Sequence, residues 1–292
     1  MTDQPIPAAP RVIDGARALQ TDYDAWFCDI WGVLHNGQDY WPAAVDAAVR
    51  FRRDHGGRVI LITNAPRPHG SVAAQLETLG INRACYDRIV TSGDVTRALI
   101  ADHAGGNVYH LGPERDRPIF AGIDVTLSAP CEASAIVNTG LFDDITETPD
   151  DYRASFTDMV AHGLPMICAN PDIVVERGTE LCYCAGALAQ VYEQLGGTVL
   201  YAGKPHRPIY ELCMAQLADV TGTDGDPGRV LAIGDGLKTD MPGAAAFGID
   251  SLFIPSGIHV SAETEVTPQS LAQLFSDHKA QPVAALPGGL RW

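Results

Sequence analysis

The chain has 292 residues, which is enough for one large domain or for a core domain with a smaller second domain. Hydrophobic residues make up 46% of it and charged residues 19%, and the mean hydropathy is near zero, which excludes a disordered or fibrous protein. The 20 basic and 36 acidic residues give a net charge of −16, which argues against nucleic acid or an anionic membrane as a partner.

The N-terminal segment and the cysteines indicate where the protein works. The first residues, MTDQPIPAAPRVIDG, carry acids and prolines where a signal peptide has a basic start and an apolar run. No apolar run approaches the length of a membrane span. The seven cysteines are odd in number and scattered through apolar runs, which is typical of reduced, buried thiols. We therefore expect a cytoplasmic protein.

Short apolar runs that end in Gly, Asn or Asp alternate with longer amphipathic segments, which is typical of β/α units and a largely parallel sheet. The predicted strands cover residues 25–30, 58–64, 88–92, 198–203, 229–235 and 251–255. The predicted helices cover residues 43–55, 71–79, 186–195, 208–220, 242–247 and 268–278. The sequence therefore predicts an α/β fold, on whose core the terminal Trp292 either packs or lies free.

The middle of the chain, from about Asp94 to Tyr183, contains a second set of such units. Its predicted strands cover residues 107–112, 134–140 and 165–172, and its predicted helix covers residues 150–162. Thr148 and Pro149 fit the N-cap and the first turn of that helix. This block is interpreted as a second α/β module inserted into the first.

Polar side chains follow four of the predicted strands, and the carboxyl ends of parallel strands are where functional groups gather. Each residue taken alone fits a turn or a helix cap. Together they bring a hydroxyl, an amide, an ammonium and several carboxylates to one sheet edge, a set that suits phosphoryl transfer with Mg²⁺. An aspartate is a suitable nucleophile because it is ionised at neutral pH. The residues are Asp29, Thr63, Asn64, Lys204, Asp235 and Asp240.

Four stretches resemble, in order, the four motifs of the haloacid dehalogenase (HAD) superfamily. They are FCDIWGVLHNG (27–37), ILITNAPRP (60–68), YAGKPHRPIY (201–210) and AIGDGLKTDMPGA (232–244). CANPD (168–172) and the segment at Gly186 resemble its subclass IIA, which holds phosphatases of N-acetylglucosamine phosphate, pyridoxal phosphate, glycerol phosphate and nitrophenyl phosphate. The resemblance implies a doubly wound, Rossmann-like core (1–93 and 184–292) with an inserted α/β cap of the C2 type (94–183).

The resemblance also implies a role for each motif residue. It makes Asp29 the nucleophile and a Mg²⁺ ligand, Asp235 a second ligand, and Asp240 a residue that helps to hold the metal or its waters. It assigns phosphate binding to Thr63 and Asn64, and it pairs Lys204 with both the phosphate and Asp29. The expected substrate is a small phosphorylated metabolite, and a homodimer is kept as an option because caps of this subclass often take part in dimers.

Asn170 and Asp172 end a strand of the inserted block, and we expect them in a substrate-binding loop. The alternative, that they only shape a turn, has equal weight.

Trp31 departs from the family pattern, because the phosphatases carry a second Asp two residues after the nucleophile. That Asp protonates the leaving group and later activates water. The main-chain carbonyl at this position also binds Mg²⁺, a role that Trp31 keeps. Its indole N–H is a donor only and does not exchange protons near neutral pH. General acid–base catalysis is commonly worth about 10²–10⁴ in rate.

Three interpretations follow from Trp31. In the first, the protein is a phosphatase in which another group, such as His35, supplies the proton, or whose substrate has a good leaving group. In the second, it binds a phosphorylated metabolite with little turnover, as a sensor or pseudo-enzyme. In the third, it resembles the dehalogenases, which have an aromatic residue at this spacing. The acidic GDGLKTD segment argues against the third, because dehalogenases need no metal.

Overall fold

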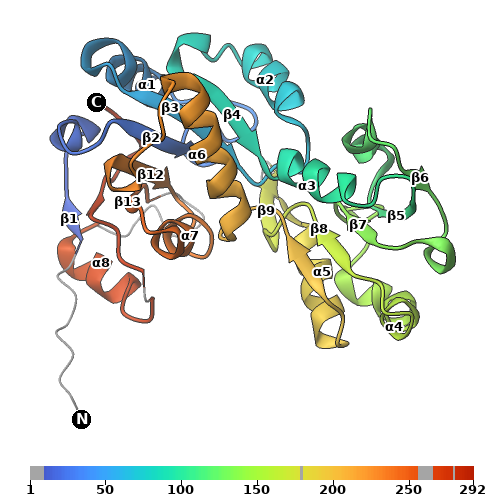
Figure 1. Cartoon of the computed structure of the whole chain (residues 1–292). Helices are drawn as coiled ribbons and strands as arrows, with labels where there is room; N and C mark the ends of the chain where they lie inside the picture. Colours follow the sequence, from blue (N-terminus) through green and yellow to red (C-terminus); the bar gives the residue numbers. More distant parts are fainter. Residues whose placement is uncertain (1–9, 178–179, 256–265, 279) are drawn as a thin grey trace. The chain divides into compact units, whose positions relative to one another are not determined.

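Seven strands form the larger sheet of the computed structural model, which describes residues 10–177, 180–255, 266–278 and 280–292 (Figure 1). Their order is β1-β14-β13-β12-β2-β3-β4, and β12 pairs in parallel with both β2 and β13. The strands are β1 (Arg11–Val12), β2 (Ala25–Asp29), β3 (Arg58–Thr63), β4 (Arg88–Thr91), β12 (Val230–Gly234), β13 (Asp250–Phe253) and β14 (Ala284–Ala285).

The strand order reverses between β2 and β12. From β2 the chain adds β3 and β4 on one side, and from β12 it adds β13 and β14 on the other. Such a reversal defines a doubly wound sheet, and its ligands bind where the order switches. The predicted doubly wound α/β fold is confirmed.

The chain divides into two units by its internal contacts. Unit 1 comprises Met1–Leu61, Leu79–Arg88 and Cys213–Trp292, and unit 2 comprises Ile62–Thr78 and Ile89–Leu212. The predicted boundaries of core and cap stay a prediction. Within the ranges that the structure describes, no helix is long and apolar enough to cross a membrane. Six of the seven cysteines are buried, in keeping with the expectation from the sequence.

Helix α1 (Pro42–His55) shows how local sequence builds unit 1. Pro42 supplies the preset φ of a first helical position, and Gly56 ends the helix with a left-handed φ of 77°. Phe51 on its buried face stacks on Trp26 of β2, with ring centroids 4.0 Å apart. The ring of Trp292 lies 6.3 Å from Trp26, so the C-terminus packs on this core. The other helices that reach into unit 1 are α6 (Arg207–Thr221), α7 (Asp240–Phe247) and α8 (Pro268–Leu274).

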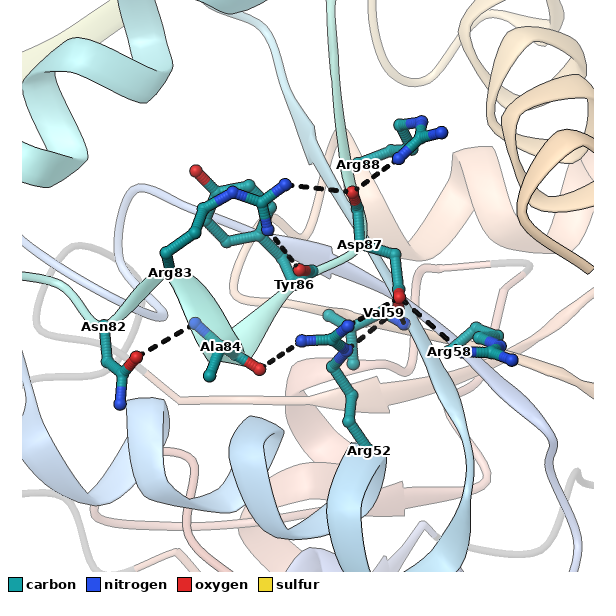
Figure 2. A network of polar contacts seen from close by, with 9 residues as sticks. All are labelled: Arg52, Arg58, Val59, Asn82, Arg83, Ala84, Tyr86, Asp87 and Arg88. Atoms are coloured by element: carbon teal, nitrogen blue, oxygen red, sulfur yellow. Dashed lines mark hydrogen bonds and ion pairs between the residues drawn. The ribbon is translucent and has the colours of Figure 1, made fainter.

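One buried carboxylate ties α1 to the segment before β4 (Figure 2). Asp87 accepts two hydrogen bonds from Arg52 of α1, at 2.9 and 2.6 Å, and one from the Val59 main-chain N–H at 2.9 Å. Arg58 approaches the same carboxylate at 3.8 Å. Asp87 is therefore the point at which α1, β3 and β4 are joined.

Unit 2 contains a five-stranded sheet in the order β11-β8-β7-β5-β6, in which every neighbouring pair is parallel. Helices α4 and α5 cover one face through a cluster that includes Phe156 and Tyr192, and α3 covers the other through Ile100. The strands are β5 (Asn107–Leu111), β6 (Thr126–Leu127), β7 (Ile136–Asn138), β8 (Met166–Cys168) and β11 (Val199–Tyr201). The helices of unit 2 are α2 (His69–Thr78), α3 (Ser92–Ala101), α4 (Arg153–Ala161) and α5 (Ala185–Gln194).

The structure corrects one step of the sequence reasoning. The strand at residues 198–203 was expected to end at the same sheet edge as those that carry Asp29 and Asp235, but β11 pairs with β8 in the five-stranded sheet. The reason is that α5 packs on β8, so the chain returns after α5 to the sheet it left. The sequence also did not predict α3 or the antiparallel hairpin of β9 (Val174–Arg177) and β10 (Glu180–Tyr183).

Candidate active site

Three buried carboxylates gather at the point where the order of the seven-stranded sheet switches. Asp29 ends β2, Asp235 follows β12, and Asp240 begins α7. One oxygen from each lies within 4.8 Å of the others. Three carboxylates this close repel one another unless a cation offsets their charge. Carboxylate oxygens are the ligands that Mg²⁺ prefers, so this donor set fits the expected metal.

Short loops hold the three carboxylates in place. The Ile30 main-chain N–H donates to Oδ1 of Asp29 at 2.7 Å, and the Gly236 N–H donates to Oδ2 of Asp240 at 3.1 Å. Gly32 has a φ of +82°, and a Cβ there would lie 2.1 Å from Oδ2 of Asp235. Only glycine combines this left-handed backbone with so close an approach to the carboxylate.

Trp31 lies between Asp29 and a turn that closes on its ring. The indole is half-buried and meets the His35 ring edge-on, with ring centroids 5.3 Å apart. Gly37 lies against the indole, because a Cβ there would be 2.4 Å from a ring carbon. His35 is 2% exposed, and its Nδ1 accepts a hydrogen bond from the Gly37 N–H at 2.9 Å. These contacts give His35 a structural role in fixing the indole.

In unit 2, the side chain of Asn64 joins residues that follow three different strands. Its Nδ2 donates to Oδ1 of Asp172 at 2.9 Å and to the Lys204 carbonyl at 3.0 Å. Its Oδ1 accepts from the Lys204 main-chain N–H at 2.7 Å. Asn170 in turn accepts a hydrogen bond from the Asp172 N–H at 3.0 Å. The structure thus brings Asn64, Asp172 and Lys204 together, with Asn170 beside them.

The remaining predicted site residues of unit 2 are buried at strand ends. Thr63 ends β3 and accepts a hydrogen bond on Oγ1 from the Ala65 N–H at 3.3 Å. Lys204 is 2% exposed. The Asn64 amide already bonds to protein groups, so it positions Lys204 and Asp172. Phosphate binding by Thr63, Asn64 and Lys204, and the pairing of Lys204 with Asp29, stay predictions.

The sequence reasoning did not consider the residues that follow β5 and β7. Gly112 follows β5, and Thr139 and Gly140 follow β7. The signal was present, because the runs NVYHLG and SAIVNTG end in Gly in the same way as the strands of the first set.

The doubly wound sheet and its carboxylate cluster place the chain in the class of α/β enzymes that bind ligands at a switch point. A sequence profile described as haloacid dehalogenase-like hydrolase matches residues 26–126, and one described as HAD-hydrolase-like matches residues 201–278. A crystal structure of a haloacid dehalogenase-like hydrolase from Brucella suis is 45% identical, covers 94% of this chain and 98% of its own, and has a TM-score of 0.83. The chain belongs to the haloacid dehalogenase-like hydrolase family, as the four motifs predicted.

More distant relatives carry functional names. An acid sugar phosphatase of Staphylococcus saprophyticus is 24% identical over 84% of this chain and 91% of its own length. A D-glycerol 3-phosphate phosphatase of Mycobacterium tuberculosis is 26% identical over 93% of this chain and 76% of its own length. A crystal structure of a possible sugar phosphatase from Cytophaga hutchinsonii, 22% identical with a TM-score of 0.76, covers 94% of this chain and 97% of its own and shares the fold.

Proposed function

We propose that this protein is a Mg²⁺-dependent phosphatase that hydrolyses a small phosphorylated metabolite, with Asp29 as the phosphoryl acceptor. The observation that carries the proposal is the cluster of Asp29, Asp235 and Asp240 at the switch point of the sheet. The named relatives support the reaction class, since an acid sugar phosphatase and a glycerol 3-phosphate phosphatase both match more than four-fifths of the chain.

In the proposed reaction, a carboxylate oxygen of Asp29 forms a bond to phosphorus while the bond between phosphorus and the leaving-group oxygen breaks. Water then attacks the acyl phosphate, which frees the Asp29 carboxylate and releases inorganic phosphate. Bound Mg²⁺ supplies positive charge that offsets the negative charge of the phosphoryl group. Asp235, Asp240 and the Trp31 carbonyl are the proposed further ligands. Thr63 and Lys204 are proposed to bind the phosphate, with Lys204 also opposing the charge of Asp29.

Trp31 determines how this phosphatase handles protons. Its indole cannot protonate a leaving group, and the contacts of His35 give that residue a structural role. The leaving group therefore takes its proton from solvent or from another side chain, or it departs as a stable anion. The same observation favours a second candidate function, a protein that binds a phosphorylated metabolite with little turnover.

The test is a screen of phosphorylated metabolites with the wild type and Asp29→Asn. We expect Mg²⁺-dependent release of phosphate by the wild type and loss of turnover in the variant with its fold intact. Retained activity in Asp29→Asn would mean a different nucleophile. Tight binding of a phosphorylated metabolite without release of phosphate would support the binding protein. Activity that survives a chelator would favour the dehalogenase-type reaction.

A further inference from the structure

The five-stranded sheet of unit 2 has a switch point of its own. From β5 the chain first adds β6 on one side, and the later strands β7, β8 and β11 follow on the other side (Figure 1). The carboxyl ends of β5 and β7 therefore lie side by side while their loops leave in opposite directions. This is the topological position that Asp29 and Asp235 occupy in the larger sheet, and ligands of open α/β sheets bind at such positions.

Three polar side chains meet at this second switch point. His110 near the end of β5 lies with Nε2 at 3.0 Å from Oγ1 of Thr139, the residue that follows β7. The Thr139 hydroxyl in turn forms a hydrogen bond with the carboxylate of Asp116. Gly112 makes room for this chain, because a Cβ there would lie 2.0 Å from the Thr139 hydroxyl. Burial lowers the pKa of His110 to about 4, so at neutral pH the ring is uncharged.

The two loops are also joined by an ion pair. Arg115 on the β5 side donates to Asp144 on the β7 side at 2.6 Å. In the same β7 loop, the Tyr152 hydroxyl donates to Glu147 and accepts a hydrogen bond from the Phe142 N–H at 2.8 Å. The loops are thus held in one arrangement before any ligand binds, which is what a specific binding site requires.

Asp116 is the unusual member of this group. It is 6% exposed, and burial raises the pKa of its carboxyl group, while Arg115, the Thr139 hydroxyl and Arg67 oppose that rise and the Asp144 carboxylate adds to it. A buried carboxylate that its surroundings do not fully compensate reduces the stability of the fold. A charge kept at a strand end under these conditions is typical of a functional position.

Arg67 links this group to the candidate phosphate site. It lies in the loop that follows β3, four residues after Thr63, and its charge acts on Asp116. Thr63, Lys204 and Asp116 all belong to unit 2. The loop that would hold the phosphate therefore also reaches the carboxyl ends of β5 and β7.

We propose that Asp116 and Thr139, with Arg67, bind the leaving group of the substrate, and that this leaving group is hydroxylated, as in a polyol or sugar phosphate. The inference rests on the proposed phosphatase function. A carboxylate accepts hydrogen bonds from hydroxyl groups, while the guanidinium of Arg67 donates to hydroxyl oxygens. Asp144 adds a second negative charge nearby, which disfavours leaving groups that carry a carboxylate.

The test compares Asp116→Asn with the control Glu114→Gln, which changes an exposed residue of the same loop. Glycerol 3-phosphate and glucose 6-phosphate serve as hydroxylated substrates, and p-nitrophenyl phosphate serves as a substrate without hydroxyl groups. In Asp116→Asn we expect the KM of the better hydroxylated substrate to rise about 10- to 100-fold, as for the loss of a hydrogen bond to a charged group. The kcat/KM for p-nitrophenyl phosphate should stay unchanged, and Glu114→Gln should match the wild type on every substrate.

Other outcomes separate the subsite from the reaction. An unchanged KM for both hydroxylated substrates, or an equal loss on all three, would overturn the subsite and leave the phosphatase standing. If the wild type hydrolyses none of them, the proposed function fails, and calorimetric binding of glycerol 3-phosphate to the wild type and Asp116→Asn tests the subsite alone. The melting temperature of Asp116→Asn should not fall, because the substitution removes a buried charge; a lower one would indicate a structural role instead.

Discussion

Gly32→Ala is a direct test of how the carboxylate cluster is built. A methyl group at this position would lie 2.1 Å from Oδ2 of Asp235, whereas Cβ contacts below 3.0 Å are essentially not observed. The carboxylate or its loop must therefore move by about 1 Å, a displacement that commonly costs on the order of 100-fold in rate. The left-handed φ of +82° adds a backbone cost of roughly 1–2 kcal/mol for any residue with a Cβ.

Gly56→Ala is the matched control, since it separates the two effects. Gly56 has a nearly identical φ of +77°, but a Cβ there would meet nothing within 4 Å. Both variants should lose stability, by about 2–4 °C in melting temperature for each kcal/mol. Only Gly32→Ala should also lose Mg²⁺ affinity, by about tenfold or more, and phosphatase activity by a larger factor.

The assay is a calorimetric Mg²⁺ titration of the wild type and both variants, together with thermal unfolding and kcat/KM on p-nitrophenyl phosphate. Equal Mg²⁺ affinity and equal activity in Gly32→Ala and Gly56→Ala would refute the reasoning. That result would mean that Asp235 does not need its present position, and hence that the cluster is not the metal site.

Two further predictions concern the proton donor and the stability of unit 1. If the missing acid limits the enzyme, the wild type should hydrolyse aryl or acyl phosphates much faster than alkyl phosphates, and Trp31→Asp should narrow that gap; equal rates in the wild type would contradict this account. Asp87→Ala should lower the free energy of unfolding by about 2–3 kcal/mol, because it leaves Arg52 and the Val59 N–H without their acceptor (Figure 2). Asp54→Ala, which breaks the exposed pair with Arg53, should leave the melting temperature unchanged, and an equal loss in both would show that Asp87 is not a structural centre.

The sequence by itself determined the fold class and the chemistry of the strand ends. Apolar runs that alternate with amphipathic segments specify β/α units, because periodicity is a local property of the chain. Asp29 and Asp235 were predicted to lie near each other for the same reason, since parallel strands end at a common edge. Their convergence with Asp240 is what the structure then displays. The departure at Trp31 is also visible in the sequence alone, because it concerns the identity of one residue in a recognised motif.

Only the tertiary structure decided which distant residues meet. Asn64 and Asp172 are 108 positions apart, and no local pattern indicates that the amide of one bonds to the carboxylate of the other. The sheet that β11 joins, the burial of Asp116 beside Thr139 and the packing of Trp292 on Trp26 likewise depend on the path of the chain. The physical reason is that a strand or helix is specified by its neighbours in sequence. A hydrogen bond between loops is specified by the packing of whole elements, which a local pattern does not contain.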